Sequence, residues 1–460
     1  MKHIHIRDFS GGHIHFIGIG GISMSGLAQI LHSRGYKVSG SDLVQSPITQ
    51  KLSSMGIKVF TDHRADNIKS ADLIAYTAAV KDDNPELVEA KRLGLPSLDR
   101  ASLLGQIMET FSYPIGVAGT HGKTTTTSML AMILYYARLD PTILVGGEVD
   151  AIGGNVRIGQ SSYFLTEACE YVGSFLKFRP LLSIILNIDL DHLDYFRDID
   201  HIYSTFLDYA RLIPKEGSMI GCYDDPRVRR LLTELDCNTI SYGLEAGADW
   251  QAYDISYDDL DHPSFKLSYR GRYLDTFSIR LAGKHNILNS LAAIIAASTI
   301  GIDKATIKKA LEDFKGTHRR FEKKGYTSQG ALLIDDYAHH PTEIKATVKA
   351  AKNLGKRLFC IFQPHTYTRT KILFDDFVEA LSGVERLIIA DIYAAREKDP
   401  GDIHSKDLAE ALTKKGVDCL HISDFEKIAE YIRAKVKKDD IVITMGAGDI
   451  YKVGDMLIKK

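Results

Sequence analysis

The fold class is decided by one stretch of the sequence, Tyr113-Pro114-Ile115-Gly116-Val117-Ala118-Gly119-Thr120-His121-Gly122-Lys123-Thr124-Thr125. Its first six residues predict a short apolar strand, and residues 124–136 predict a helix. Between strand and helix, the glycines, lysine and threonine have the G-x-x-G-K-T spacing of a short phosphate-binding loop. Because a strand, a phosphate loop and a helix in this order belong to a parallel sheet, the stretch predicts an α/β protein.

The chemistry of this loop follows from its residue types. Glycines let backbone N–H groups turn toward phosphate oxygens, and the N-terminus of the helix adds a favourable dipole. Lys123 would place its charge on the β- and γ-phosphates, and the Thr124 hydroxyl would ligate Mg²⁺. A glycine-rich turn with a surface lysine is the alternative interpretation. The predicted ATP-binding residues of the loop are Gly119, Thr120, His121, Gly122, Lys123, Thr124 and Thr125.

A second glycine turn lies near the start of the chain. The apolar run His13–Ile17 predicts a strand, and Gly18-Ile19-Gly20-Gly21-Ile22-Ser23 follows it and opens a helix. Asp42 comes at the end of the next predicted strand, near the distance at which an acidic residue meets a ribose. This pattern indicates a dinucleotide or nucleotide-diphosphate site. An NAD-dependent Rossmann oxidoreductase fits it as well, and a tight turn without a ligand is the third interpretation.

Strands alternate with helices on both sides of the phosphate loop. A chain of 460 residues is too long for one hydrophobic core. We therefore predict three α/β domains with parallel sheets: a Rossmann-like domain over residues 1–110, a central phosphate-loop ATPase domain over 111–316, and a Rossmann-like domain over 317–460. Residues 237–280 look like a β-rich insertion in the central domain.

Polar residues follow several of the predicted strands. In the central segment, Glu167 and Glu170 come after the run Tyr163–Thr166, and Asp191-His192 comes after Leu182–Asn187. Because the carboxyl ends of parallel strands gather at one edge, these groups could hold Mg²⁺ against nucleotide phosphates. For each residue alone, a surface or capping role is at least as good an interpretation.

The last segment has a denser set of polar clusters. Each of the three clusters follows a predicted strand, and together they indicate a second reactant beside the nucleotide. They are Asp335–Glu343, Gln363–Thr370 and Gly446–Asp449, and the guanidinium pair Arg319-Arg320 precedes them.

Composition excludes several classes of protein. The net charge of −2 gives no basic field for nucleic acid. The five cysteines form no C-x-x-C pair, which favours reduced thiols over a zinc or redox motif. No apolar run reaches the roughly 18 residues of a membrane span, and the start lacks a signal-peptide pattern. We therefore expect a cytoplasmic protein that binds neither nucleic acid nor membrane, as a monomer or homodimer.

Taken in order, these stretches resemble the Mur ligases of peptidoglycan synthesis along the whole chain. Each piece alone is common, but the ordered set is highly specific. The matching stretches are His15–Gly21, Gly119–Thr124, Asp191-His192, His285–Asn289, Arg319–Glu322, Asp335–Glu343 and Gly446–Ile450.

The resemblance implies a site in each domain. The first domain would hold a UDP-sugar, the second ATP with Mg²⁺, and the third an amino acid. The implied substrate-binding residues are Gly18, Gly20, Gly21, His63, Thr77, Asp336, His339 and Arg369. The implied metal ligands are Thr124, Glu167 and His192, and the implied catalytic residues are Lys123, Glu167, His192, Arg320 and His339. His285 and Asn289 would face the adenine, and Arg320 would swing toward the ATP phosphates.

The activity implied by the resemblance is the ligation of L-alanine to the lactyl carboxylate of UDP-N-acetylmuramate. The carboxylate would attack the γ-phosphate of ATP, and the amine of alanine would attack the resulting acyl-phosphate. His339 would serve as the base, because an imidazole pKa ordinarily lies near neutral pH. A ligase that adds a whole murein peptide to the same sugar nucleotide is the first alternative, and a nucleotide-binding regulator without activity is another.

Two positions depart from the pattern of this family. Related sequences often have arginine where Thr366 stands, three residues before Arg369. They also have an aspartate-rich run where this chain has Glu167-Ala168-Cys169-Glu170-Tyr171-Val172. The two glutamates remain, so the expected metal ligand is kept while its neighbours differ.

Overall fold

The computed structural model describes residues 4–77, 79–258, 261–395 and 397–458. The chain divides into two compact units. Unit 1 comprises Met1–Ile188, Tyr203–Asp249 and Ala292–Ala310, and unit 2 comprises Asp189–Ile202, Trp250–Leu291 and Leu311–Lys460. Three helices run across a unit boundary: α6 (Ile199–Ala210), α8 (Lys284–Ile300) and α9 (Lys304–Asp313).

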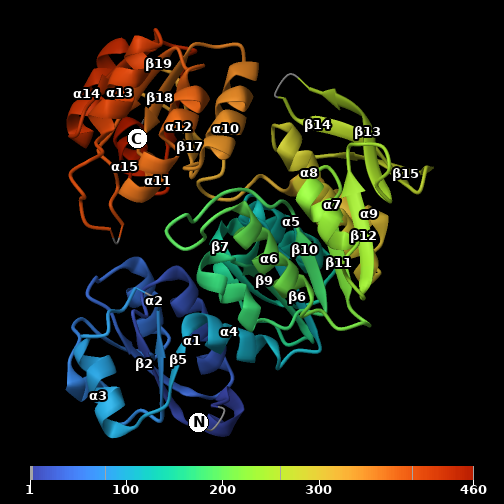
Figure 1. Ribbon diagram of the computed structural model, residues 1–460, viewed down its shortest axis with the longest axis vertical. Helices are drawn as coiled ribbons and strands as arrows, with labels where there is room; N and C mark the ends of the chain where they lie inside the picture. Colours follow the sequence, from blue (N-terminus) through green and yellow to red (C-terminus); the bar gives the residue numbers. More distant parts are fainter. Residues whose placement is uncertain (1–3, 78, 259–260, 396, 459–460) are drawn as a thin grey trace. The chain divides into compact units, whose positions relative to one another are not determined.

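The first sheet of unit 1 has five parallel strands in the order β3-β2-β1-β4-β5. The central strand is buried at every position, as expected for a parallel strand with helices on both faces. Its elements, drawn in blue in Figure 1, are β1 (His13–Ile17), α1 (Ile22–Ser33), β2 (Lys37–Ser41), α2 (Pro47–Ser54), β3 (Lys58–Phe60), β4 (Leu73–Tyr76), α3 (Pro85–Leu93), β5 (Ser97–Asp99) and α4 (Arg100–Met108).

The second set of strands in unit 1 contains the phosphate loop. Its order is β12-β11-β10-β6-β9-β7-β8, parallel throughout except for the β7–β8 hairpin. The elements are β6 (Tyr113–Ala118), α5 (Lys123–Tyr136), β7 (Thr142–Val149), β8 (Gly154–Arg157), β9 (Tyr163–Ala168), β10 (Leu182–Ile185), β11 (Ser218–Cys222), α7 (Pro226–Leu232) and β12 (Asn238–Gly243).

The register of these strands explains the position of the loop. Ala118, the last residue of β6, pairs with Ala168 of β9 on one side and with Ile185 of β10 on the other. The residues that follow these three strands therefore meet at one edge. The phosphate loop is consequently flanked by the segment after Ala168 and by the segment after Ile185.

Unit 2 contains an antiparallel meander and a six-stranded sheet. The meander is β13 (Trp250–Tyr257), β14 (Pro263–Tyr269) and β15 (Arg272–Ser278). The sheet has the order β16-β17-β21-β18-β19-β20, and only β16 is antiparallel. Its strands are β16 (Glu322–Tyr326), β17 (Leu332–Asp336), β18 (Leu358–Phe362), β19 (Arg386–Ile389), β20 (Asp418–His421) and β21 (Ile441–Met445).

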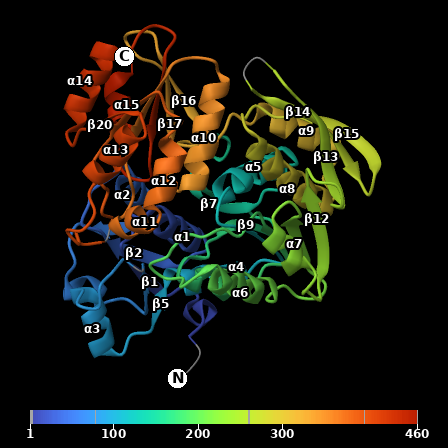
Figure 2. The ribbon, with the colours of Figure 1, turned by 45° about the horizontal axis from the view of Figure 1, so that its top comes forward.

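Alternating side chains bury both faces of this six-stranded sheet. Leu358, Cys360 and Phe362 belong to one core cluster, whereas Phe359 and Ile361 belong to the other. This is the two-residue period of a strand with helices on both sides, and Figure 2 shows the helices that flank it. The helices are α10 (Pro341–Asn353), α11 (Tyr367–Ile372), α12 (Phe374–Leu381), α13 (Ser405–Lys414), α14 (Phe425–Lys435) and α15 (Tyr451–Leu457).

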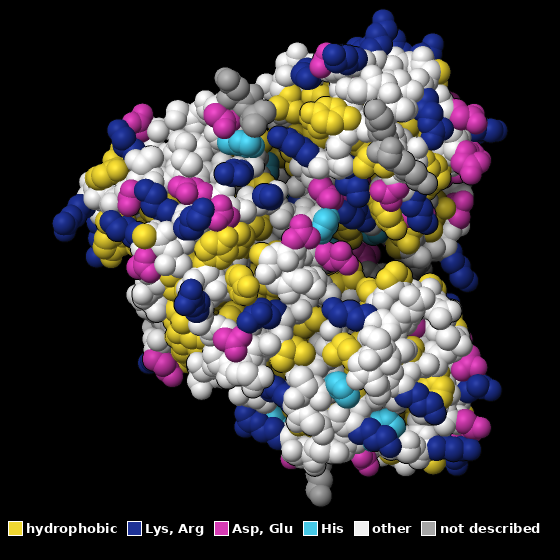
Figure 3. Space-filling model, turned by 180° about the vertical axis from the view of Figure 1, so that it is seen from behind, with side chains coloured by type: hydrophobic (Ala, Val, Ile, Leu, Met, Phe, Trp, Pro, Cys, Tyr) yellow, Lys and Arg dark blue, Asp and Glu magenta, His cyan; other side chains and the backbone are white. Residues whose placement is uncertain are grey.

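The sequence predicted the fold class correctly, including the β-rich character of residues 237–280. The positions of the domain boundaries stay predictions. All five cysteines are unpaired. Among the described residues, no helix is long and apolar enough to cross a bilayer. On the face drawn in Figure 3, acidic and basic side chains are interspersed.

Candidate active site

The phosphate loop is shaped by two glycines and one asparagine. Gly119 and Gly122 have φ values of 138° and 85°, in the region that disfavours other residues. A Cβ on Gly119 would also approach the Leu186 side chain to 2.9 Å. The Asn187 side chain accepts a hydrogen bond from the His121 N–H (2.8 Å) and donates one to the His121 carbonyl (3.1 Å). Asn187 was not among the predicted site residues, although its place just after β10 is a usable signal.

Lys123 begins α5 and turns its ammonium back over the loop. The ammonium donates to the carbonyl oxygens of Gly119 and Thr120 and lies 2.9 Å from Glu170 Oε2. Burial alone would lower the pKa of Lys123, but the Glu170 carboxylate outweighs it and raises that pKa. The lysine therefore stays charged, as a group that binds phosphate must.

The predicted metal ligands of unit 1 lie on two neighbouring elements. Thr124 and Thr125 are buried in the first turn of α5. Glu167 lies within β9, and its Oε1 accepts the Gly146 N–H at 2.7 Å. The Thr124 hydroxyl and the Glu167 carboxylate are hard oxygen donors, so these two predicted ligands fit Mg²⁺ by their chemistry.

In the first sheet, the strand ends bring Gly18 and Thr77 together. Gly18 follows β1 and Thr77 follows β4, and a Cβ on Gly18 would lie 2.9 Å from the Thr77 methyl. Asp42, which follows β2, accepts the Gly20 N–H at 2.9 Å and the Val44 N–H at 3.0 Å. The Asp42 carboxylate therefore shapes the glycine turn.

His63 lies at the exposed end of a buried polar network around Glu86. Glu86 is completely buried and accepts hydrogen bonds from Ser41 (2.6 Å), Asn67 (2.8 Å) and His63 Nδ1 (2.9 Å). His15 Nε2 lies 3.3 Å from Glu86 Oε1. Burial alone would raise the pKa of Glu86, but His15, Ser41 and Asn67 outweigh it and lower that pKa. Glu86 was not among the predicted site residues, because it lies in a helix and in no motif.

The two neighbouring arginines of unit 2 have different environments. Arg319 donates to the carbonyl oxygens of Gly446 (2.7 Å) and Gly448 (3.1 Å) and to Asp335 (3.2 Å), so it joins three segments. The Arg320 guanidinium lies over the Tyr337 ring at 4.9 Å, and its Nη1 is 3.9 Å from Glu343 Oε1. Arg320 is therefore less tightly held than Arg319.

Asp336 is the last residue of β17, and His339 lies three residues after it. The Asp336 carboxylate accepts the N–H groups of Phe321 (2.8 Å) and Ala338 (2.6 Å), and burial raises its pKa to about 6. His339 Nδ1 donates to the Tyr337 carbonyl (3.0 Å), which leaves Nε2 as an acceptor. Burial lowers the pKa of His339 to about 4, so the expectation of a pKa near neutral was wrong.

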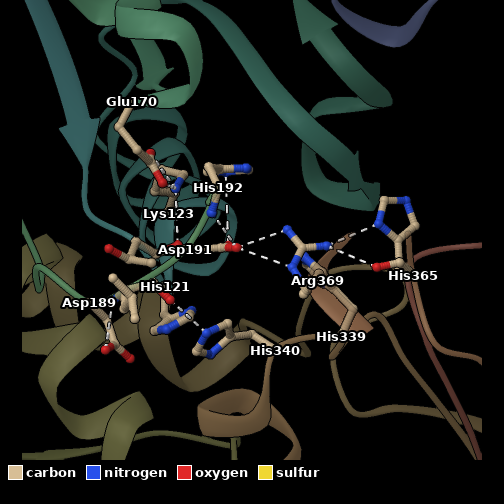
Figure 4. Close-up of polar contacts among 12 residues, drawn as sticks. His121, Lys123, Glu170, Asp189, Asp191, His192, His339, His340, His365 and Arg369 are labelled. Atoms are coloured by element: carbon tan, nitrogen blue, oxygen red, sulfur yellow. Dashed lines mark hydrogen bonds and ion pairs between the residues drawn. The ribbon is translucent and has the colours of Figure 1, made fainter. Parts of the chain in front are cut away.

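Arg369 is held by two side chains of unit 2. Its Nη2 and Nε lie 2.9 Å and 3.1 Å from Asp191 Oδ1, and its Nη1 donates to His365 Nδ1 at 3.1 Å (Figure 4). Burial alone would raise the pKa of Asp191, but His192 and Arg369 hold it well below its usual range. The His192 N–H donates to Asp191 Oδ1 at 2.7 Å. Thr366 accepts the Arg369 N–H (3.4 Å) and so caps the helix that carries this arginine.

Both predicted adenine-facing residues lie in the first part of α8. His285 is exposed, whereas Asn289 is buried and donates to Asn286 Oδ1 at 3.1 Å. The adenine role of this pair stays a prediction.

Three successive parts of the chain match Mur ligase domains. Residues 13–112 match the Mur ligase family, catalytic domain; residues 117–297 match the Mur ligase middle domain; and residues 319–448 match the Mur ligase, glutamate ligase domain. The chain belongs to the Mur ligase family. Curated relatives of this Mur ligase include UDP-N-acetylmuramate–L-alanine ligases of Acetivibrio thermocellus (53% identical, covering 97% of this chain and 96% of the relative) and of Caldanaerobacter subterraneus subsp. tengcongensis (50% identical, covering 97% of each).

Solved structures agree with this assignment. A UDP-N-acetylmuramate–alanine ligase from Thermotoga maritima has a TM-score of 0.83 and 28% identity, over 97% of this Mur ligase and 98% of that chain. A murein peptide ligase from Psychrobacter arcticus has a TM-score of 0.74 and 26% identity over the same shares. Family membership does not favour the oxidoreductase alternative, which leaves the phosphate loop without a role.

Proposed function

We propose that this Mur ligase joins L-alanine to the lactyl carboxylate of UDP-N-acetylmuramate, at the expense of ATP, in peptidoglycan synthesis. The observation that carries this is identity of 50–53% to curated UDP-N-acetylmuramate–L-alanine ligases over nearly the full chain. The cytoplasmic location and the monomeric or dimeric state stay predictions.

The first step needs a site that stabilises charge on a transferring phosphoryl group. The lactyl carboxylate oxygen attacks the γ-phosphorus of ATP, and ADP leaves with the electrons of the broken P–O bond. Lys123 and the N–H groups at the start of α5 would bind the phosphates, and Arg320 would add a second cation. Mg²⁺, when bound by Thr124 and Glu167 and with His192 beside a second ion, would neutralise further phosphate charge.

The second step needs a neutral amine next to the acyl-phosphate. The alanine nitrogen attacks the carbonyl carbon, the C–O bond to phosphate breaks, and the nitrogen loses a proton. His339 would orient the amine through its Nε2 lone pair, since its Nδ1–H is fixed on Tyr337. With a pKa of about 4, His339 is a weak base, so we assign it an orienting role before a proton-removing one.

The sugar nucleotide would bind at the strand ends of the first sheet. Gly18, Gly20 and Gly21 would meet the diphosphate, and His63 and Thr77 the nucleoside. Alanine would bind in unit 2, its carboxylate near Arg369 and its amine near His339, with Asp336 holding the local backbone.

The deciding experiment measures phosphate release from ATP with UDP-N-acetylmuramate and Mg²⁺. We expect release that depends on L-alanine, with a product one alanine residue heavier than the sugar nucleotide. Release that ignores L-alanine but responds to a murein tripeptide would replace this proposal by the peptide-recycling alternative.

A further inference from the structure

A cluster of two histidines and an aspartate lies in unit 2, apart from the residues discussed so far. Asp391 follows β19, His404 immediately precedes α13, and His421 is the last residue of β20. Ile389 pairs with His421 in the parallel register, so Asp391 and His421 emerge at the same edge of the sheet. One nitrogen from each histidine and one carboxylate oxygen lie within 4.8 Å of one another.

The distances in this cluster bracket those of a metal site. His421 Nε2 lies 2.7 Å from Asp391 Oδ1, and His404 Nε2 lies 4.0 Å from the same oxygen. A tetrahedral zinc ion with bonds of about 2.0–2.1 Å holds its ligand atoms about 3.3–3.4 Å apart. Both distances to the Asp391 oxygen are within about 0.7 Å of that separation.

We propose that Asp391, His404 and His421 form a binding site for a divalent transition metal of the zinc class. Two imidazoles and one carboxylate are a borderline donor set, which favours Zn²⁺, Co²⁺ or Ni²⁺ over Mg²⁺. The side chain of His421 is 12% exposed, whereas those of Asp391 and His404 are 51% and 49% exposed. Solvent can therefore supply the fourth ligand. Ser423 donates to Asp391 Oδ1 at 3.1 Å and orients the carboxylate.

The tautomer of His404 must change when the metal binds. The His404 Nδ1 accepts the Lys406 N–H at 3.1 Å, so in the neutral imidazole Nε2 carries the proton. Coordination through Nε2 requires that this proton leave Nε2 and that Nδ1 become protonated, which breaks the bond from Lys406. His404 is the N-cap residue of α13, and its own N–H donates to the Asp407 carboxylate at 2.7 Å. This second hydrogen bond of the cap does not involve the imidazole and would remain.

The site would join both ends of one long connection. Residues 390–404 link β19 to α13, and two of the three ligands lie at the ends of this segment. Tyr393, two residues after Asp391, donates its N–H to the Pro364 carbonyl (2.8 Å) and stacks on His365 at 5.7 Å. His365 in turn accepts from Arg369. A bound ion would thus fix the segment that supports the proposed alanine-binding arginine.

The test measures Zn²⁺ binding by calorimetry and Co²⁺ binding by visible absorption, with the full-length protein in excess Mg²⁺. The variants are H404Q, H421Q and D391N, and the matched control is H262Q. His262 also pairs with an aspartate in unit 2, Asp258 at 3.1 Å, but belongs to no three-ligand group among the described residues. Thermal unfolding of each apo-variant checks that it is folded.

We expect the wild type and H262Q to bind one ion more than any of the three ligand variants, or to bind it at least about tenfold more tightly. Zn²⁺ should also accelerate hydrogen exchange of the Lys406 amide. The proposal is overturned if the wild type binds no Zn²⁺ beyond that bound by H421Q and H404Q. A loss confined to one of the three ligand variants would overturn it too. Neither outcome bears on alanine ligation, which is measured separately without added transition metal.

Discussion

Glu170 Oε2 lies 2.9 Å from the ammonium of Lys123, and the two side chains are 2% and 15% exposed (Figure 4). The charge of the phosphate-loop lysine is thus balanced by a buried carboxylate. The pair exists because β6 and β9 end in register, so that the residues after Ala118 and Ala168 meet. A nucleotide that binds here adds negative charge beside Glu170, so the Lys123 ammonium must balance the charge of the phosphates as well as that of the Glu170 carboxylate.

From this pair we predict different effects of two variants. Lys123→Met should lower kcat by at least about 10²-fold, since it removes a preorganised charge from the phosphoryl group. It should also lower the free energy of unfolding by about 3–5 kcal/mol, because it removes the cation that pairs with the buried Glu170 carboxylate. Steady-state phosphate release and urea unfolding measure the two effects.

The double variant Lys123→Met/Glu170→Gln is the matched control. It removes the negative charge at residue 170 together with the lysine, so stability should recover while turnover stays low. If the double variant is as unstable as the single one, Glu170 is not the group that the lysine compensates.

The sequence could predict this edge of the sheet but not the pairing within it. The G-x-x-G-K-T spacing and the strand patterns located the loop, Glu167 and Glu170, because glycine turns and parallel strand ends leave a local signal. Which glutamate meets Lys123 depends on where β9 ends, and the structure extends that strand to Ala168. Glu86 had no signature and Asn187 had only its place just after β10, since their roles arise from helix and strand packing across the chain.

The Glu86 network predicts a change in sugar-nucleotide binding without a change in chemistry. In Glu86→Gln the amide nitrogen would face hydrogen-bond donors, which should cost about 1–3 kcal/mol of stability. His63 would lose the acceptor that fixes its Nδ1–H. We therefore expect a higher KM for UDP-N-acetylmuramate with kcat unchanged. Initial rates at saturating ATP and alanine measure both constants.

Glu89→Gln is the control for this variant, because Glu89 lies on the same helix and pairs with Arg92, three residues along it, at 2.7 Å. It should leave the KM for UDP-N-acetylmuramate unchanged. An equal rise in KM in both variants would contradict the prediction.

The lowered pKa of Glu86 also makes the free energy of unfolding depend on pH. Its stabilising contribution is present above the ordinary value of 4.5 and is lost as the pH falls through the lower folded-state pKa.

His339 should make unit 2 less stable in mild acid. Its folded-state pKa of about 4 lies below the ordinary 6.5, so the unfolded chain binds more protons between these values. Its contribution to stability is present above about pH 6.5 and is lost as the pH falls toward 4. From pH 7 to pH 5 the loss should be about 2 kcal/mol.

His339→Gln, which cannot titrate, should reduce that loss by the same amount. Urea unfolding of both proteins at the two pH values, followed by circular dichroism, checks it. His262→Gln, in the same unit, should keep the wild-type dependence. Identical pH dependence in wild type and His339→Gln would mean that the histidine is not held neutral by burial.

Arg369 should be replaceable by lysine only at a large loss of alanine affinity. Its guanidinium contacts Asp191 and His365 at once, and a lysine ammonium cannot span both with the same geometry. An imperfectly paired Asp191 would then compete for the cation that the alanine carboxylate needs. We expect Arg369→Lys to raise KM for L-alanine by at least about tenfold.

Arg386→Lys is the matched control, since Arg386 pairs with Asp418 at 2.9 Å near the surface of the same unit. KM values for ATP and the sugar nucleotide, measured alongside, should change little in either variant. If Arg369→Lys raises all three KM values equally, the arginine supports the fold of the unit and does not bind alanine.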